Sequence, residues 1–271
     1  MKKNILTYLG GMVVLCSLLS SCVSTPSPSS NTTPNSTRPQ IVTPNHSLTK
    51  DKEEKYTELT KTDHFDTITI KEELDYLTTD ISYPSFDEYI GLDKYVENLV
   101  QSGWNEFKEK SELSWKEIAE LNSYSLPPYE YYVKFSVFDN KNIISIYLEI
   151  YSFNGGAHGQ TNIKTVNYDK NTEKFLTITE ATNLSYEELA ECSRKYLYKT
   201  LIEDEKFEID GETVLLLDEM REEGTYPIAG NYEAFTINDD ILSIYFEPAK
   251  VAPHYYGIQI VEIKLQNKKI Q

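Results

Sequence analysis

The stretch YEYYVKFSVFDNKNIISIYLEI, residues 129–150, decides the fold class. Apolar residues occupy every second position on both sides of the polar residues 139–142. Alternating side chains point to opposite faces of a strand, and Asp and Asn favour tight turns. The stretch therefore predicts an antiparallel β-hairpin that buries one of its faces.

The residues before this hairpin predict strands and then a helix. Residues 67–83 contain β-rich patches, which indicate one or two strands. Apolar residues recur at helical spacing over residues 92–107, and residues 115–119 are expected to continue the helix after a break. Pro127 and Pro128 then end any helical structure.

The residues after the hairpin predict a second hairpin, a helix and a meander. Residues 161–168 are expected to pair with residues 174–178. Ser185 and Glu188 form a capping box that opens a helix. Three strands follow at residues 232–237, 241–246 and 256–265. The order strand, helix, four strands, helix, three strands predicts an α+β fold, with a largely antiparallel sheet and helices packed on one face.

The N-terminus has the layout of a secretory signal, because a basic start precedes a short apolar run and small residues. The sequence Leu19-Ser20-Ser21-Cys22 resembles the lipobox of bacterial lipoproteins. The resemblance implies removal of residues 1–21, with cleavage after Ser21 and acylation of Cys22. An ordinary signal peptide or a spanning helix are the alternatives, although a span needs about 20 apolar residues and this run is shorter.

A tether and two domains are expected after the signal. Residues 23–50 are dominated by Ser, Thr, Pro and Asn, and such a segment buries too little apolar surface to fold. We therefore predict a disordered tether over residues 22–66. A small α+β domain is predicted at residues 67–151, and a C-terminal α+β domain at residues 152–271.

The charge balance restricts the partners. The chain has a net charge of -17, and removal of Lys2 and Lys3 with the signal leaves 24 basic against 43 acidic residues, a net charge of -19. Such a surface disfavours nucleic acid and attracts cationic partners. If Cys22 carries lipid, Cys192 is the remaining cysteine of the mature chain and is expected in the core. No cofactor and no metal site are predicted.

Two loops are the candidate ligand-binding sites, and no catalytic residue is predicted because the sequence lacks the common catalytic motifs. The glycines of the first loop allow close approach of a ligand to the backbone, and two prolines stiffen the second loop. A purely structural role for each loop is the alternative. The candidate residues are Asn154, Gly155, Gly156, His158 and Gly159 in the first loop, and His254, Tyr255 and Tyr256 in the second.

These loops also carry a family resemblance. The sequence Tyr151-Ser152-Phe153-Asn154-Gly155-Gly156-Ala157-His158-Gly159, with Val166-Asn167-Tyr168-Asp169 and the run at residues 245–257, resembles a C-terminal domain of unknown function. That domain occurs in the lysozyme-responsive anti-sigma factor RsiV and beside the catalytic domain of PdaC-type peptidoglycan deacetylases. Residues 67–151 resemble the smaller domain that precedes it. The sequence shows neither a sigma-binding segment nor the deacetylase metal motifs, so we expect neither signalling nor deacetylation.

Three functions are compatible with the sequence. The first is a lipid-anchored envelope protein that binds a cationic protein such as lysozyme, as the resemblance implies, or a cell-wall glycan. The second is an envelope enzyme acting on glycan or peptide, with His158 as general base. The third is a structural or antigenic surface lipoprotein without a defined ligand. In each case the expected location is extracytoplasmic, on the outer membrane where the cell has one.

Overall fold

The structure is a computed structural model that describes residues 54–60, 64–121, 127–201, 207–209, 212–214 and 216–265. Ser21, Cys22 and the predicted signal lie outside the described residues, as does most of the predicted tether. None of the helices in the described part of the chain combines the length and the apolar run that crossing a bilayer requires.

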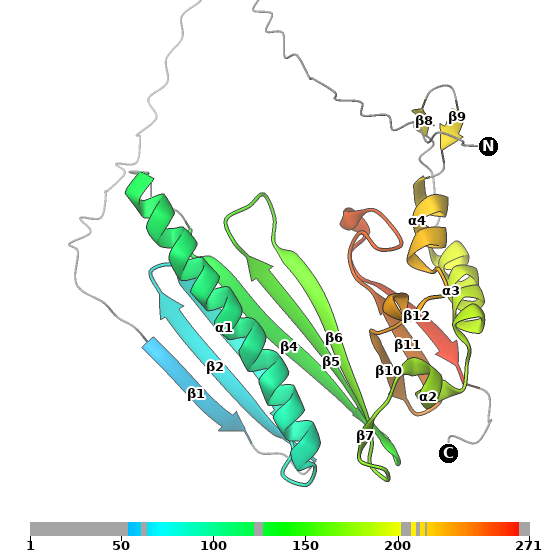
Figure 1. The fold of residues 1–271 in the computed structure, drawn as a ribbon, viewed down its shortest axis with the longest axis horizontal. Helices are drawn as coiled ribbons and strands as arrows, with labels where there is room; N and C mark the ends of the chain where they lie inside the picture. The colour runs from blue at the N-terminus through cyan, green and yellow to red at the C-terminus, as the bar shows by residue number, and fades with distance from the viewer. Residues whose placement is uncertain are drawn as a thin grey trace, which may run out of the picture. The chain divides into compact units, whose positions relative to one another are not determined.

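A seven-stranded sheet follows the order of the chain, and its neighbours are antiparallel except for the parallel pair β3–β4 (Figure 1). The predicted hairpin is confirmed, because β4 pairs with β5 in the register Val133↔Ile150. The crossover between β3 and β4 contains helix α1, Ile90–Leu121. The strands are β1 Glu54–Thr60, β2 Asp66–Leu74, β3 Leu77–Ser85, β4 Tyr129–Asp139, β5 Ile143–Phe153, β6 Gln160–Asp169 and β7 Lys174–Phe175.

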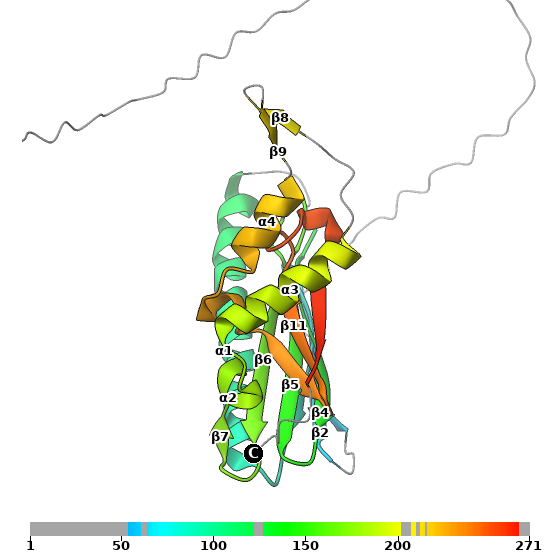
Figure 2. The same cartoon turned by 90° about the vertical axis from the view of Figure 1, so that its right-hand side faces the viewer.

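Helix α1 covers one face of this sheet and forms the first core with it (Figures 1 and 2). Val96, Val100 and Trp104 are buried against alternate residues of the strands, such as Ile81 and Ile146. The helix is continuous, whereas the sequence predicted a break before residue 115. Residues 108–114 contain neither Pro nor Gly to interrupt it.

The C-terminal part builds a second core on a three-stranded antiparallel sheet, with α3 and α4 lying over it (Figure 2). The predicted capping box is confirmed, since Ser185 and Glu188 exchange both hydrogen bonds at the start of α3. The predicted meander is also confirmed. The elements are α2 Ile178–Thr182, α3 Tyr186–Thr200, β8 Phe207–Ile209, β9 Glu212–Val214, α4 Leu216–Gly224, η1 Ala229–Asn231, β10 Phe235–Asn238, β11 Ile241–Phe246, η2 His254–Tyr256 and β12 Gln259–Lys264.

Strand β10 docks by its edge onto the back face of the large sheet, which is the face opposite α1. The backbone of β10 is bonded by polar side chains there: Ser145 Oγ accepts from Ile237 N at 3.0 Å, and Asn167 Nδ2 donates to the Phe235 carbonyl at 2.8 Å. Thr165 Oγ1 accepts from Phe235 N at 3.0 Å. Ser145 also donates to Asn167 Oδ1 at 2.6 Å, so these groups are satisfied inside the protein. We call these bonds the seam.

The α+β class is confirmed, with a largely antiparallel sheet that carries helix α1 on one face. The structure differs from the sequence analysis at two boundaries. Strand β1 falls inside the predicted tether of residues 22–66, because its polar sequence pairs with β2 from Glu54↔Glu73 to Thr60↔Thr67. The large sheet also continues past residue 151, since β5 ends at Phe153 and pairs along its length with β6.

Candidate functional site

The two predicted loops meet in the structure. His158 lies in the connection between β5 and β6, and His254 opens the short helix η2. Their ring centroids are 4.7 Å apart, with an angle of 35° between the ring planes. Residues 96 positions apart in the sequence thus form one exposed surface, which we call the histidine surface and define as His158, His254, Tyr255 and Tyr256.

Glycines shape the first loop because aromatic rings pack against its backbone. Gly155 has a φ of 84°, in the left-handed region that favours glycine. A Cβ on Gly159 would lie 2.3 Å from ring carbons of Tyr151, so a side chain there would have to displace the tyrosine. His158 Nδ1 lies 3.0 Å from the Gly159 carbonyl, which requires a proton on Nδ1 and leaves Nε2 open to a ligand. Asn154 and Gly156 are exposed in the same loop.

The middle of the second loop is buried in the protein, and the end of the loop is exposed to solvent. Val251 and Ala252 are buried in the second core. Tyr255 is 71% exposed, and its ring centroid lies 4.6 Å from that of Tyr256, which is half-buried. A firmly held loop that presents an aromatic ring loses little entropy on binding. Of the predicted residues, the structure therefore joins the two histidines with the tyrosine pair.

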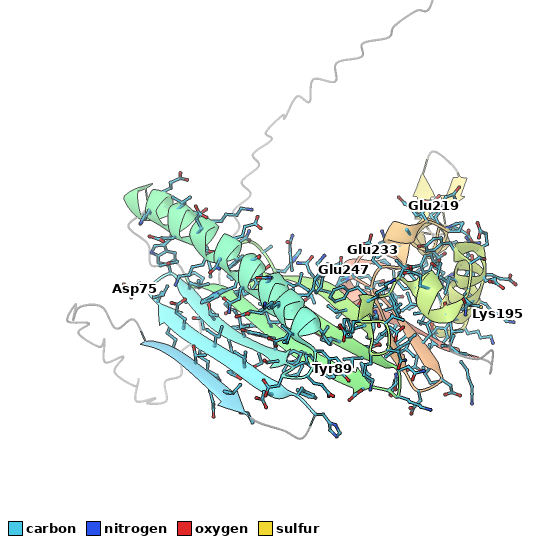
Figure 3. All side chains as sticks on the ribbon, turned by 60° about the horizontal axis from the view of Figure 1, so that its bottom comes forward. Asp75, Tyr89, Lys195, Glu219, Glu233 and Glu247 are labelled. Carbon is cyan, nitrogen blue, oxygen red and sulfur yellow. The ribbon has the colours of Figure 1, made fainter. Side chains whose placement is uncertain are left out.

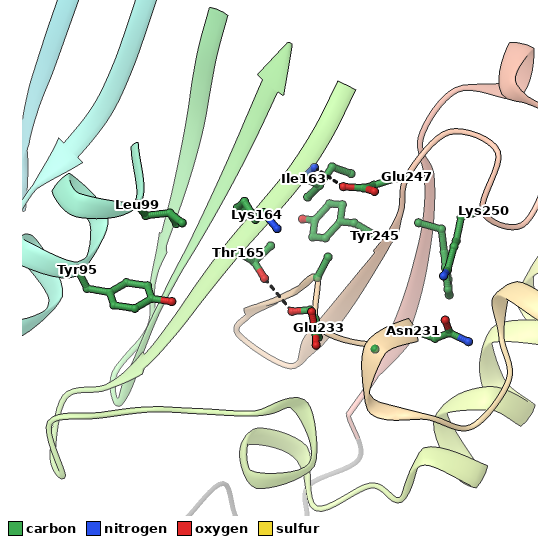
Figure 4. Close-up of a pocket in the computed structure, with 13 residues that line it drawn as sticks. Tyr95, Leu99, Ile163, Lys164, Thr165, Asn231, Glu233, Tyr245, Glu247 and Lys250 are labelled. Carbon is green, nitrogen blue, oxygen red and sulfur yellow. Dashed lines mark hydrogen bonds between the residues drawn. The ribbon is translucent and has the colours of Figure 1, made fainter. Parts of the chain in front are cut away.

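A cavity of about 450 Å³ lies at the outer side of β6, between α1 and the second core (Figure 4). Tyr95 and Leu99 of α1 line one side, and Tyr245 of β11 lines the other. Glu247 and Lys250, at the start of the second loop, also line it. The second loop thus contributes to both the cavity and the histidine surface.

Hydrogen bonds hold the polar lining of this cavity in place. Glu247 Oε1 accepts a hydrogen bond from the backbone N–H of Ile163 at 2.8 Å (Figure 4). Asn231 Nδ2 donates to the carbonyls of Glu223 and Tyr226, at 3.2 and 3.0 Å. Because both bonds use its amino group, the carboxamide oxygen of Asn231 is the atom left for a ligand.

Tyr245 and its neighbour Tyr147 keep their protons at neutral pH. Their ring centroids are 4.7 Å apart. Burial raises the pKa of Tyr245, and burial followed by the charge of Glu149 raises the pKa of Tyr147. Tyr245 Oη lies 2.9 Å from Thr236 Oγ1. Both phenols therefore act as neutral hydrogen-bonding groups.

A second cavity of about 860 Å³ lies over the back face of β2, β3 and β4. Lys71 and Asp80 in its lining form an ion pair at 3.1 Å. Tyr132 also lines it and stacks on Tyr151, with ring centroids 5.8 Å apart. The charged groups of this face are thus partly paired with each other.

Cys192 is half-buried on α3, and burial raises the pKa of its thiol. A raised pKa leaves less thiolate, the reactive form, at neutral pH. Among the described residues there is no group of three or more side chains placed to hold a metal ion.

Sequence reasoning missed the charged residues of the first cavity. Glu247 and Lys250 belong to the second loop, but only the histidine and the two tyrosines of that loop were predicted as ligand-binding residues. Lys164 and Glu233 come from other elements, and only the edge docking of β10 on β6 brings them together. No periodicity in the sequence indicates that docking.

Two families match successive parts of the chain. Residues 70–161 match the family described as Deacetylase PdaC, and residues 182–266 match a Protein of unknown function (DUF3298). Peptidoglycan-N-acetylmuramic acid deacetylase PdaC from Bacillus subtilis (strain 168) is 29% identical over 188 residues. That match covers 68% of this chain and 36% of the length of the enzyme. The predicted similarity to PdaC-type proteins and to the domain of unknown function is confirmed.

Two solved structures of DUF3298 family proteins are also similar, each at 16% identity. The protein from Pseudomonas aeruginosa PAO1 has a TM-score of 0.46, with 79% of this chain and 88% of the other covered. The protein from Bacteroides fragilis NCTC 9343 has a TM-score of 0.51, with 79% and 89% covered. The second similarity indicates a shared fold and says nothing of a shared ligand.

Proposed function

We propose that this chain is a lipid-anchored, extracytoplasmic binding protein of the bacterial envelope that recognises a component of the cell wall. The similarity to a protein named as a peptidoglycan deacetylase supports the wall as the place of action. The juxtaposition of His158 and His254 carries the proposal, because it joins both candidate loops into one exposed surface. Tyr255 beside them offers the kind of exposed aromatic ring that dominates binding surfaces.

Co-sedimentation of the full-length protein with purified peptidoglycan sacculi tests this proposal. We expect saturable retention that weakens by about tenfold in Tyr255→Ser, since one central aromatic contributes on the order of 1–2 kcal/mol. Tyr198→Ser is the matched control, because Tyr198 is an exposed tyrosine on α3. Retention that is absent, or equal in Tyr255→Ser and the wild type, would count against the proposal.

A cationic protein such as lysozyme is a second candidate ligand, and the net charge of -17 favours it. Opposite charges accelerate association, and added salt screens them. Titration with lysozyme at rising salt concentration separates the two ligands. A complex at low salt that weakens as salt rises would support lysozyme, and no complex at low salt would exclude it.

The enzymatic alternative assigns His158 as a general base. A general base needs an orienting partner and reach to the substrate proton. In the part of the chain that the structure describes, the His158 ring is hydrogen-bonded to the Gly159 carbonyl and lies beside the tilted ring of His254, and no carboxylate orients it. We expect His158→Ala to lower wall binding, and a loss of wall turnover in that variant would favour the enzyme instead.

The lipid anchor is the remaining part of the proposal. We expect Cys22 to carry the acyl chains, so that Cys22→Ala leaves the protein outside the membrane fraction. Mass spectrometry of the mature N-terminus provides the direct measurement. An unmodified thiol at Cys22 in the purified wild type would disprove the anchor and leave wall binding to be judged on its own test.

A further inference from the structure

The cavity beside β6 gathers charges of both signs that do not neutralise each other. Glu233 and Glu247 supply two carboxylates, and Lys164 and Lys250 supply two ammonium groups. Within the described part of the chain, none of the four forms an ion pair, whereas the second cavity pairs Lys71 with Asp80. The four groups are therefore available to charges of a ligand.

The placement of these groups is specific to the cavity. Glu233 and Glu247 both line the cavity, on either side of Tyr245 (Figure 4), while Glu219 and Lys195 lie on the outer helices (Figure 3). Glu247 is half-buried and fixed by the Ile163 N–H at 2.8 Å. A carboxylate held in this way presents its remaining oxygen in one direction.

The outer side of β6 lines the cavity and holds Glu247 in place. Strand β7 pairs with Tyr168 and Asp169, so residues 160–165 of β6 have no further strand beside them in the described structure. Ile163 at this edge bonds a side chain instead of a strand. Ile163 is buried and its N–H is satisfied, so the carboxylate of Glu247 is fixed against the edge of β6 at this point.

We propose that this cavity binds a short zwitterionic peptide, with its ammonium groups at Glu233 and Glu247 and its carboxylate at Lys250. A simple anion would meet two carboxylates, and a simple cation would meet two ammonium groups, so a ligand with both charges is favoured. The Asn231 carboxamide oxygen supplies a further acceptor for a peptide N–H. The cavity is a second site beside the histidine surface, and this inference rests on the proposed function, because wall peptides carry both kinds of charge.

Calorimetric titration of the full-length protein with the tripeptide L-Lys-D-Ala-D-Ala tests the site. The matched probe is the same tripeptide with both amines acetylated and the carboxylate amidated, which removes every charge. We expect the charged probe to bind at least about tenfold more tightly, since charge-assisted hydrogen bonds are the strong ones. Equal affinity for both probes would overturn the proposal.

Substitutions locate the binding. Glu233→Gln and Lys250→Gln should each weaken tripeptide binding by about fivefold, in keeping with partly exposed charge contacts. The controls Glu219→Gln and Lys195→Gln remove charges from exposed positions on α4 and α3 and should leave binding unchanged. Unchanged thermal unfolding in all four variants shows that each is folded. Equal effects in the cavity and control variants would overturn the proposal.

Sacculi with and without their peptides separate this inference from the proposed function. If amidase-treated sacculi, which keep the glycan and lose the peptides, retain the protein fully and the tripeptide does not bind, the inference fails and wall binding stands. If the tripeptide binds but neither kind of sacculus retains the protein, the site stands as one for free peptides and wall binding fails. Loss of retention on amidase treatment supports both.

Discussion

The seam and the cavity lie within a few residues of each other on β6, but they differ in their polar side chains. Those of the seam are bonded within the protein, and the charged groups of the cavity are not paired with one another among the described residues. In the seam, Asn167 and Ser145 are buried and use their polar atoms on each other and on β10. In the cavity, Lys164 and Glu233 are both exposed, and neither forms an ion pair in the described structure. Groups satisfied internally hold the fold, whereas groups left open are available to a ligand.

The difference follows from the cost of burying polar groups. A buried donor or acceptor without a partner costs about 1–3 kcal/mol, so the polar groups of the seam must all be hydrogen-bonded. An exposed charge is solvated by water and contributes little to stability. The two regions should therefore respond differently to substitution: the seam through unfolding, the cavity through binding.

The largest expected effect is the loss of the seam in Asn167→Leu. This change removes the donor to the Phe235 carbonyl and the acceptor of Ser145 Oγ, and both remaining groups are left buried. We expect the free energy of unfolding to fall by about 3 kcal/mol. Urea denaturation measures it, with Asn162→Leu as the exposed control on the same strand. Equal midpoints for both variants would contradict the structural role of the seam.

The second effect is a loss of at most about 2 kcal/mol per residue in the free energy of unfolding at high pH, and it concerns a buried tyrosine in each core. Burial raises the pKa of Tyr131 to about 12, with a smaller contribution from the charge of Glu106, and burial also raises that of Tyr232 to about 12. Their pKa in the unfolded chain is about 10, so between pH 10 and 12 the unfolded state loses the proton first and stability falls as the pH rises.

Urea denaturation between pH 9 and about pH 12 measures this loss, and Tyr232→Phe is the matching variant. The variant also loses the 2.7 Å hydrogen bond from Tyr232 Oη to the Thr225 carbonyl, so its stability is lower at pH 9. Its further loss toward pH 12 should be smaller than that of the wild type. An identical pH dependence in both proteins would show that Tyr232 does not titrate as expected.

A smaller effect, about 1 kcal/mol, is expected for Gly159→Ala at the start of β6. The added Cβ would meet the Tyr151 ring at 2.3 Å, so the ring or the loop must move. The His158–His254 contact should loosen, and wall binding should weaken with it. Gly156→Ala is the control, because the nearest atoms to its Cβ lie 3.9 Å away. Equal behaviour of the two variants would contradict the packing role of Gly159.

The smallest effect on stability is expected in the cavity itself. Glu233→Gln and Lys250→Gln should change the free energy of unfolding by less than about 0.5 kcal/mol, because both side chains are exposed and neither pairs with another charge in the described residues. Urea denaturation of both variants beside Asn167→Leu measures the contrast. A loss comparable to that of Asn167→Leu would mean that the cavity charges serve the fold.

Much of the fold could be predicted from the sequence because its signals are local. The alternation in residues 129–150 and the capping box at Ser185 each involve neighbours in the chain. Strand β1 was missed because its sequence, EKYTELT, is mostly polar. It forms a strand because its backbone pairs with β2. The continuous α1 was missed because tertiary packing of Trp115 on Tyr129 supports residues that the pattern alone leaves doubtful.

The candidate site was predictable only in its parts. Glycines and prolines marked both loops, but nothing local indicates that His158 and His254 meet. The cavity depends on β10 docking by its edge, which places Glu233 beside Thr165 through contacts 68 residues apart in sequence. Long-range contacts of this kind leave no periodicity in a single sequence.

Retention of the full-length protein on purified sacculi, measured as the bound fraction against sacculus concentration, tests the central claim most directly. The account predicts saturable binding by the wild type that Lys250→Gln weakens while its urea midpoint stays at the wild-type value. A wild-type protein that remains in the supernatant at every sacculus concentration would contradict it.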